Sequence, residues 1–141
     1  MKFEHEVFIA APAHDVWRLT TDIESWPGMS PTFTSVRRLD EGSLRVGSTA
    51  LVKQPGQRAT TWTVTAVEAP HRFEWAARVL GVRMVASHEV MAADGGCRNR
   101  LTLTMSGPGA RVLAAVGGRL MRRSLATENE GFRRHAESLP A

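Results

Sequence analysis

Alternation of apolar and polar residues divides most of the chain into strands. Over residues 2–10 the apolar residues and His5 fall mainly on one face and the charged residues on the other, which predicts a half-buried strand. Strand-like patterns recur in six later segments separated by short turns: residues 32–39, 48–53, 58–68, 72–80, 82–92 and 98–105. Connections this short predict an antiparallel sheet.

Helical patterns flank these strands. Residues 13–20 and 22–26 predict two short helices, the first preceded by Pro12 and the second ended by Pro27 and Gly28. Residues 108–139 predict one long helix, with a kink or a later start at Gly117 and Gly118. Together these elements predict a single domain over residues 1–141 of the α+β class. In it, a seven-stranded antiparallel curved sheet is wrapped around the C-terminal helix.

The long helix has an unusual inner face. At about 100° per residue its large apolar side chains form two shoulders: Leu113, Val116 and Leu120, and opposite them Met121, Leu125, Phe132 and Leu139. Between the shoulders lie small or polar residues and one carboxylate, Glu128. A helix that only filled a core would carry large aliphatic residues there, so the pattern predicts a helix that covers a cavity. The outer face carries six arginines: Arg111, Arg119, Arg122, Arg123, Arg133 and Arg134.

Composition and charge narrow the possible partners. The 141 residues are 43% hydrophobic and 23% charged, with a net charge of +4, and the positive charge is almost all arginine, concentrated on the outer face of the long helix. No motif for nucleic acid accompanies these arginines, and no apolar run is long enough to cross a membrane. The start does not resemble a signal peptide, and Cys97 has no partner for an internal disulfide. We therefore expect a cytoplasmic protein without a nucleic-acid partner and without membrane insertion, as a monomer or homodimer.

Inward-facing positions of the strands, the segment after the second short helix and the long helix converge on the expected cavity. An apolar pocket with a few polar groups is typical of small-molecule sites. The candidate ligand-binding residues are Trp26, Met29, Phe33, Trp62, Phe73, Trp75, Met84, His88, Leu101, Leu103, Met105, Leu120, Ser124 and Glu128.

His88 and Glu128 are the candidate catalytic residues. His88 would hydrogen-bond a ligand or move a proton, or it is a structural histidine. Glu128 would pair with His88, bind a ligand or act as an acid whose pKa is raised by burial, or it reaches solvent at the cavity rim. His5, His88 and Glu128 lack the spacing of metal ligands, and no phosphate-binding loop is present, so neither a metal nor a cofactor is predicted.

Four stretches of the chain resemble the START/Bet v1-like superfamily, in particular its polyketide cyclase/dehydrase and lipid-transport branch. They are IAAPAHDVWRLTTDIESWPGMSP, VEAPHRFEW, SHEVMAADGGCRNRLTLTMSGPG and the closing EGFRRHAE. The resemblance implies the helix-grip fold, in which a seven-stranded antiparallel sheet grips the C-terminal helix around an apolar cavity. DIESWPG is especially similar to bacterial aromatase/cyclases. Phe33 and Ala66 stand where those enzymes carry a proposed working tyrosine and arginine.

The sequence is compatible with three functions. The first is a binding module for a small, largely hydrophobic molecule such as a polyketide, an aromatic, a sterol-like compound or an acyl chain, entered past residues 26–29. The second is a polyketide aromatase/cyclase or dehydratase that works in the same cavity through His88 or Glu128. The third, weaker possibility is an interaction domain that uses the arginine face.

Overall fold

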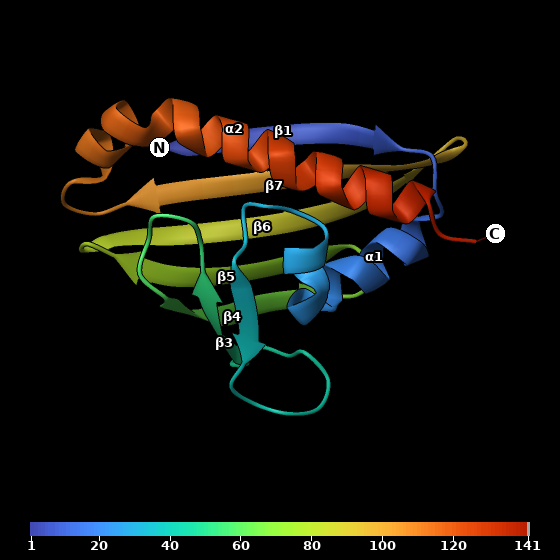
Figure 1. The fold of residues 1–141 in the computed structure, drawn as a ribbon, viewed down its shortest axis with the longest axis horizontal. Coiled ribbons are helices and arrows are strands. Elements are labelled where there is room, and N and C mark those ends of the chain that lie inside the picture. The colour runs from blue at the N-terminus through green and yellow to red at the C-terminus, as the bar shows by residue number, and fades with distance from the viewer. Residues whose placement is uncertain (141) are drawn as a thin grey trace.

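The computed structural model describes residues 1–140 and contains one seven-stranded antiparallel sheet with a long helix across its inner face (Figure 1). The strand order is β1-β7-β6-β5-β4-β3-β2, so the first strand of the sequence pairs with the last. The strands are β1 (Lys2–Ile9), β2 (Ser35–Arg38), β3 (Thr49–Lys53), β4 (Thr60–Glu68), β5 (Arg72–Val79), β6 (Val82–Ala93) and β7 (Gly96–Ser106). The helices are α1 (Ala13–Thr21), the 3-10 helix η1 (Ile23–Gly28) and α2 (Ala110–Glu137).

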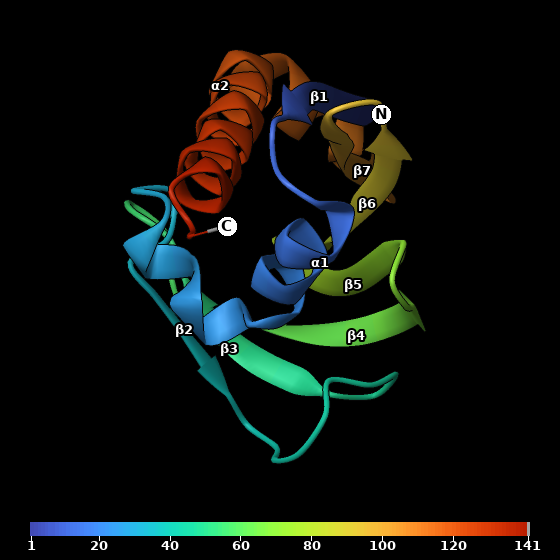
Figure 2. The ribbon, with the colours of Figure 1, turned by 90° about the vertical axis from the view of Figure 1, so that its right-hand side faces the viewer.

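The sheet curls around α2 instead of lying flat. Figure 2 shows the strands turning from β1 round to β2, with α2 on the inner side and α1 beside the same opening. A bulge between Val64 and Ala66 shifts the pairing of β4 with β5, and such bulges bend a strand and increase its twist. The predicted α+β fold, a curved antiparallel sheet wrapped around one long C-terminal helix, is confirmed.

Several predicted boundaries differ from the structure, among them the end of the second short helix, because η1 includes Pro27 and Gly28. The strand expected over residues 32–39 is limited to Ser35–Arg38, because the chain turns at residues 30–33, where the Phe33 N–H donates to the Ser30 carbonyl at 3.3 Å. The long helix runs unbroken through Gly117 and Gly118, so the helix start predicted there is wrong. Gly118 lies against β1, where a Cβ would meet the ring of Phe3 at an ordinary contact distance of 3.5 Å.

This packing rotates α2 away from one of its predicted faces. The first half of the helix rests on β1 through Gly118 and Phe3, so the shoulder containing Val116 and Leu120 is left exposed. Leu139, beyond the helix end, is also exposed. The prediction that these three residues pack against the sheet is wrong, because helical spacing defines a face but not which part of it the sheet covers.

The second half of α2 is fixed by a buried polar network. Asn129 is fully buried, and its Oδ1 accepts a hydrogen bond from Asn99 Nδ2 at 2.9 Å. Its Nδ2 lies 3.0 Å from His5 Nδ1 and donates to the backbone carbonyls of His5 and Asn99 at 3.2 and 3.0 Å. The network joins α2 to β1 and β7 at the sheet edge. It defines the rotation of the helix about its own axis.

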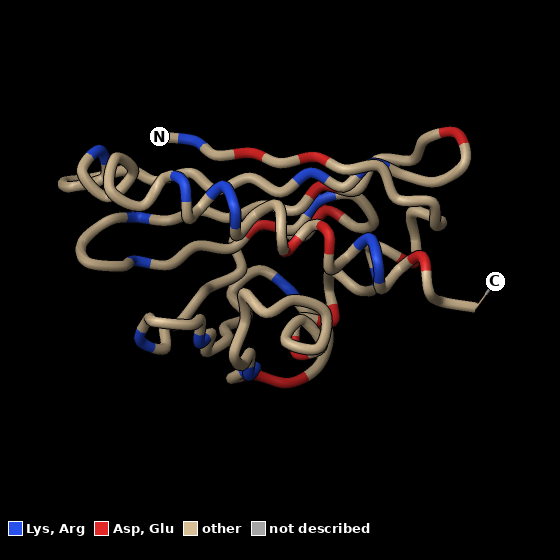
Figure 3. Tube along the Cα trace, turned by 45° about the horizontal axis from the view of Figure 1, so that its top comes forward, with Lys and Arg blue, Asp and Glu red and all other residues tan. Residues whose placement is uncertain are grey.

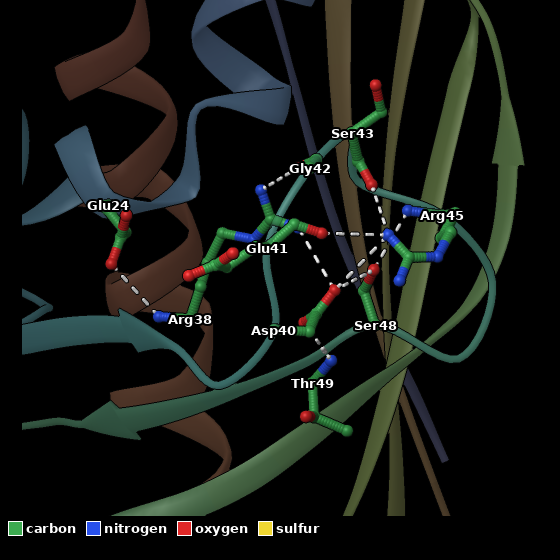
Figure 4. A network of polar contacts seen from close by, with 9 residues as sticks. All are labelled: Glu24, Arg38, Asp40, Glu41, Gly42, Ser43, Arg45, Ser48 and Thr49. Carbon is green, nitrogen blue, oxygen red and sulfur yellow. Dashed lines mark hydrogen bonds and ion pairs between the residues drawn. The ribbon is translucent and has the colours of Figure 1, made fainter.

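A second polar network organises the loop between β2 and β3. One oxygen of the Asp40 carboxylate accepts the Thr49 N–H at 3.0 Å, and the other accepts the Ser48 hydroxyl at 2.9 Å and lies 3.2 Å from Arg38 (Figure 4). The hydrogen bond from Thr49 holds the pKa of Asp40 below its usual value. Because the hydrogen-bond partners of this carboxylate all lie within its own loop, we infer that Asp40 stabilises the loop and is not part of a functional site.

Candidate functional site

A cavity of about 540 Å³ lies between the sheet and α2. Eleven of the fourteen residues predicted from the sequence line it: Trp26, Phe33, Trp62, Trp75, Met84, His88, Leu101, Leu103, Leu120, Ser124 and Glu128. The remaining three lie outside the cavity. Phe73 and Met105 are buried in the core, and Met29 packs on α2, where a Cβ on Gly131 would come within 2.3 Å of the Met29 carbonyl oxygen.

Aromatic side chains form one wall of the cavity. The rings of Trp62 and Trp75 are 5.5 Å apart, and Trp26 lies 5.2 Å from both Trp75 and Phe33. Trp26 is anchored from behind, because its indole N–H donates to the Leu19 carbonyl at 3.1 Å. Tilted and edge-on contacts of this kind hold rings in fixed positions. The result is a stiff apolar surface suited to a flat or extended apolar molecule.

The opening of the cavity lies at the end formed by loops and the first half of α2. The lining residues that are exposed to solvent mark it: Pro31, Pro55, Gln57, Leu80, Leu120 and Arg123. Trp26 is buried at the other end, so the entrance predicted at residues 26–29 is wrong. The chain directly after η1 lies against α2, where a Cβ on Gly131 would come within 2.3 Å of the Met29 carbonyl oxygen, and Pro27, Gly28 and Met29 do not line the cavity.

His88 and Glu128 face each other at the inner end of the cavity. His88 Nε2 lies 3.7 Å from Glu128 Oε1, which is too far for a hydrogen bond. The imidazole sits among three aromatic rings, with centroid distances of 4.9 Å to Trp26, 5.7 Å to Phe132 and 5.8 Å to Phe73. His88 Nδ1 is buried and has no hydrogen-bond partner among residues 1–140. The pair therefore has unused donor and acceptor capacity.

Burial sets the protonation of this pair. It raises the pKa of Glu128 to about 8, and it lowers the pKa of His88 to about 3. At neutral pH the inner end thus holds a protonated carboxyl group and a neutral imidazole. A neutral carboxyl can donate a hydrogen bond to a carbonyl or hydroxyl, and a neutral imidazole can accept one.

Sequence patterns missed part of the lining. The loop between β3 and β4 contributes Gln54, Pro55 and Gln57, which the sequence identified only as a turn. Periodicity assigns side-chain direction in strands and helices, but it says nothing of direction in a turn.

Among residues 1–140, no three His, Cys, Asp or Glu side chains lie close enough to hold a metal ion. None of the helices within that range has the length and apolar character needed to cross a bilayer.

A curved antiparallel sheet, one long helix across it and an apolar cavity between them define a helix-grip protein. The chain belongs to the polyketide cyclase/dehydrase and lipid transport family, whose model matches residues 1–137. The predicted family and its Bet v1-like, helix-grip fold are thus confirmed.

Known proteins similar to this chain agree with that assignment. A candidate polyketide cyclase from Streptomyces halstedii is 33% identical over 60 residues, which is 43% of this chain and 54% of that relative. The chain therefore spans about half the length of the curated relative it matches.

Solved structures share the fold at low sequence identity. A hypothetical protein of Helicobacter pylori has a TM-score of 0.84 at 14% identity, covering 96% of this chain and 88% of that one. The protein Ara h 8.0201 has a TM-score of 0.76 at 18% identity, covering 99% of both chains. The di-domain ARO/CYC BexL from the BE-7585A biosynthetic pathway has a TM-score of 0.72 at 19% identity, covering 99% of this chain and 51% of that one.

Proposed function

We propose that this protein binds one small, largely apolar molecule in the cavity, with a polar group of that molecule against His88 and Glu128. The ligand class is a polyketide, an aromatic, a sterol-like compound or an acyl chain. The proposal rests on one combination: an aromatic wall, and at the inner end the pair His88 and Glu128, whose polar atoms are not hydrogen-bonded to each other. A volume of about 540 Å³ falls within the roughly 300–1,000 Å³ typical of small-molecule pockets.

The position of the polar pair favours one orientation of the ligand. Glu128 and His88 lie inside, whereas the exposed lining residues at the opening include Leu80 and Leu120. A carbonyl or hydroxyl at the leading end of a ligand would reach the Glu128 proton and the His88 nitrogen. Its apolar body would then contact Trp62 and Trp75. A ligand with polar groups along its body would lose water there without gaining partners.

A titration with a neutral naphthalene-type ligand tests this proposal, because quenching of the cavity tryptophans reports binding. We expect saturable binding in the micromolar range and at least a tenfold loss of affinity in Trp75→Ala. Phe8→Ala is the matched control, since Phe8 lies on the exposed outer face of β1. Absence of saturable binding, or equal affinity in Trp75→Ala and the wild type, would contradict the proposal.

A second function is favoured by one observation, the raised pKa of Glu128 beside a neutral histidine. Such a pair suits a dehydration or cyclisation of a polyketide-like substrate. Neutral His88 would take a proton from the carbon next to a carbonyl, and Glu128 would protonate the departing hydroxyl, which leaves as water. Transfer of the proton from His88 to Glu128 would then restore the starting state.

Residue replacement separates the carrier from the enzyme. For the enzyme, Glu128→Gln and His88→Gln should each lower turnover of a β-hydroxy ketone by about a hundredfold or more while the fold survives. Equal turnover in the wild type and the double variant would exclude catalysis by this pair. Phe33 lines the cavity and Ala66 does not, so the tyrosine and arginine positions of the aromatase/cyclases supply no polar group here.

A further inference from the structure

The opening of the cavity carries an apolar stripe that no other element covers within residues 1–140. Val112, Val116 and Leu120 follow one another at intervals of four residues along α2, and their exposed fractions are 68%, 83% and 65%. At about 100° per residue they lie on one side of the helix. Leu120 also lines the cavity, so the stripe begins at the opening itself.

The turn between β5 and β6 adds a fourth exposed aliphatic side chain. Leu80 is 88% exposed, and it lines the same opening. Its φ is 52°, and the φ of Gly81 is 79°, a pair of left-handed residues that a two-residue hairpin turn normally fills with Asn-Gly. Leucine in this position is disfavoured by backbone sterics and exposes apolar surface. Neither cost is offset by a contact of Leu80 with the buried core.

Arginines surround these four residues. Arg119 and Arg123 alternate with the stripe on the same side of α2, Arg111 lies beside its start, and the stretch from residue 110 to residue 127 contains no Asp or Glu. Arg111, Arg119 and Arg123 have no ion-pair partner within the described part of the chain. Figure 3 shows lysine and arginine at the end of the molecule where α2 begins, while Asp and Glu lie mostly elsewhere.

We propose that this rim surface, formed by Leu80, Val112, Val116, Leu120 and the neighbouring arginines, docks on an anionic phospholipid bilayer. The aliphatic side chains would enter the boundary of the acyl chains, and the guanidinium groups would bind lipid phosphates. The inference rests on the proposed function, because docking would open the cavity directly onto the layer in which an apolar ligand dissolves.

The composition of the rim surface favours a bilayer over a protein partner. The cores of protein interfaces are enriched in aromatic residues, whereas the exposed apolar residues here are all aliphatic. They also come from the tip of a hairpin and the side of a helix, which suits shallow insertion at several points. Charge of one sign matches the uniform negative charge of an acidic lipid surface.

Vesicle flotation tests the proposal. The full chain is mixed with vesicles of phosphatidylcholine alone, or of phosphatidylcholine and phosphatidylglycerol in equal parts. We expect binding to the anionic vesicles only, and its loss in 1 M salt, where the screening length falls to about 3 Å. Val112→Ser/Val116→Ser and Arg111→Gln/Arg119→Gln should each lower the partition coefficient by about tenfold.

Two control variants carry the same types of substitution at positions outside the rim surface. Val46→Ser changes an equally exposed valine in the loop between β2 and β3, and Arg134→Gln changes an exposed arginine in the last turn of α2. Both should bind vesicles as the wild type does. Equal losses in the control and rim variants would overturn the proposal. So would binding to poly-glutamate without binding to anionic vesicles, which would make the rim a surface for an acidic protein.

Ligand titrations without vesicles separate this proposal from the proposed function. The rim variants change no residue that lines the cavity, so they should keep wild-type affinity for the naphthalene-type ligand. Ligand binding without vesicle binding would overturn docking and leave the binding function intact. Vesicle binding without ligand binding would overturn the proposed binding function and leave docking on the bilayer supported.

Discussion

Two neighbouring residues of α2 serve different purposes, although both are buried and polar. Asn129 points to the sheet edge, and both atoms of its side-chain amide are paired with His5 and Asn99. Glu128 points into the cavity, where its closest charged or basic neighbour, His88, lies 3.7 Å away. A buried polar group without a hydrogen bond costs folding free energy. The first cluster, in which only Asn99 Oδ1 lacks a partner among residues 1–140, therefore supports the fold, and the second does not.

This contrast identifies the inner end of the cavity as the functional region. A polar group that lines the cavity and keeps its bonding capacity free is available to a ligand, and the Glu128 carboxyl, 3.7 Å from His88 Nε2, is such a group. The Asn129 network, in turn, orients α2 so that the preceding residue faces the cavity. Stability and function are thus placed on adjacent positions of one helix.

The largest effect should come from breaking the paired cluster. Asn129→Ala removes the partner of the Asn99 amide and of His5, and leaves buried groups unpaired. We expect the free energy of unfolding to fall by about 3 kcal/mol, measured by urea denaturation. The folded fraction should still bind the naphthalene-type ligand. A loss below about 1 kcal/mol would show that the two clusters do not differ as described.

The second-largest effect should be a pH dependence of stability that arises from Glu128 and His88. Above pH 6.5, histidine in the unfolded chain has lost its proton, whereas folded Glu128 keeps its proton until about pH 8. Because the folded chain then binds one proton more, stability falls as pH rises, by about 2 kcal/mol between pH 6.5 and 8. Glu128→Gln should lack this fall. Parallel curves for the two proteins would contradict a buried, protonated Glu128.

Replacing Glu128 by leucine should have a smaller effect, opposite in sign to that of Asn129→Ala. Near pH 5.5, the substitution removes a carboxyl group without a hydrogen bond, so the free energy of unfolding should rise by up to about 1 kcal/mol. Urea denaturation at this pH measures it. Destabilisation by 2 kcal/mol or more would mean that Glu128 supports the fold as Asn129 does.

The smallest expected change in stability comes from a substitution in the rim surface, at Leu80. Leu80→Asn places a residue that tolerates positive φ in the turn between β5 and β6, so thermal denaturation should show a gain of about 0.5–1 kcal/mol. Vesicle binding should weaken in the same variant. A protein that becomes more stable and also binds anionic vesicles better would contradict a role for Leu80 in docking.

Much of the fold could be predicted from the sequence, because period-two alternation marks each strand and short turns allow only antiparallel neighbours. The inward faces of β5, β6 and β7 followed directly, including His88, Leu101 and Leu103. The rotation of α2 could not be predicted. It depends on the contact of Gly118 with Phe3 and on the Asn129 network, both of which join residues far apart in the chain.

The limits of the site prediction have the same origin. Glu128 was identified because one carboxylate stood out on a small-residue face, and its position in the cavity follows that pattern. Asn129 was missed, since a single amide on a helix carries no signal of burial. The entrance was misplaced because the opening is lined by turn residues such as Pro55, Gln57 and Leu80, and periodicity does not reveal side-chain direction in a turn.

The most direct test of the central claim compares two ligands of the same shape. In 2-acetylnaphthalene and 2-ethylnaphthalene the carbon skeleton is shared, and only the first carries a carbonyl oxygen. We measure the affinity of both for the wild type and for Glu128→Leu by calorimetric titration. The account predicts that the ratio of ketone to hydrocarbon affinity falls about tenfold in Glu128→Leu, the loss of one buried hydrogen bond. An unchanged ratio would contradict the claim that the inner polar pair recognises the ligand.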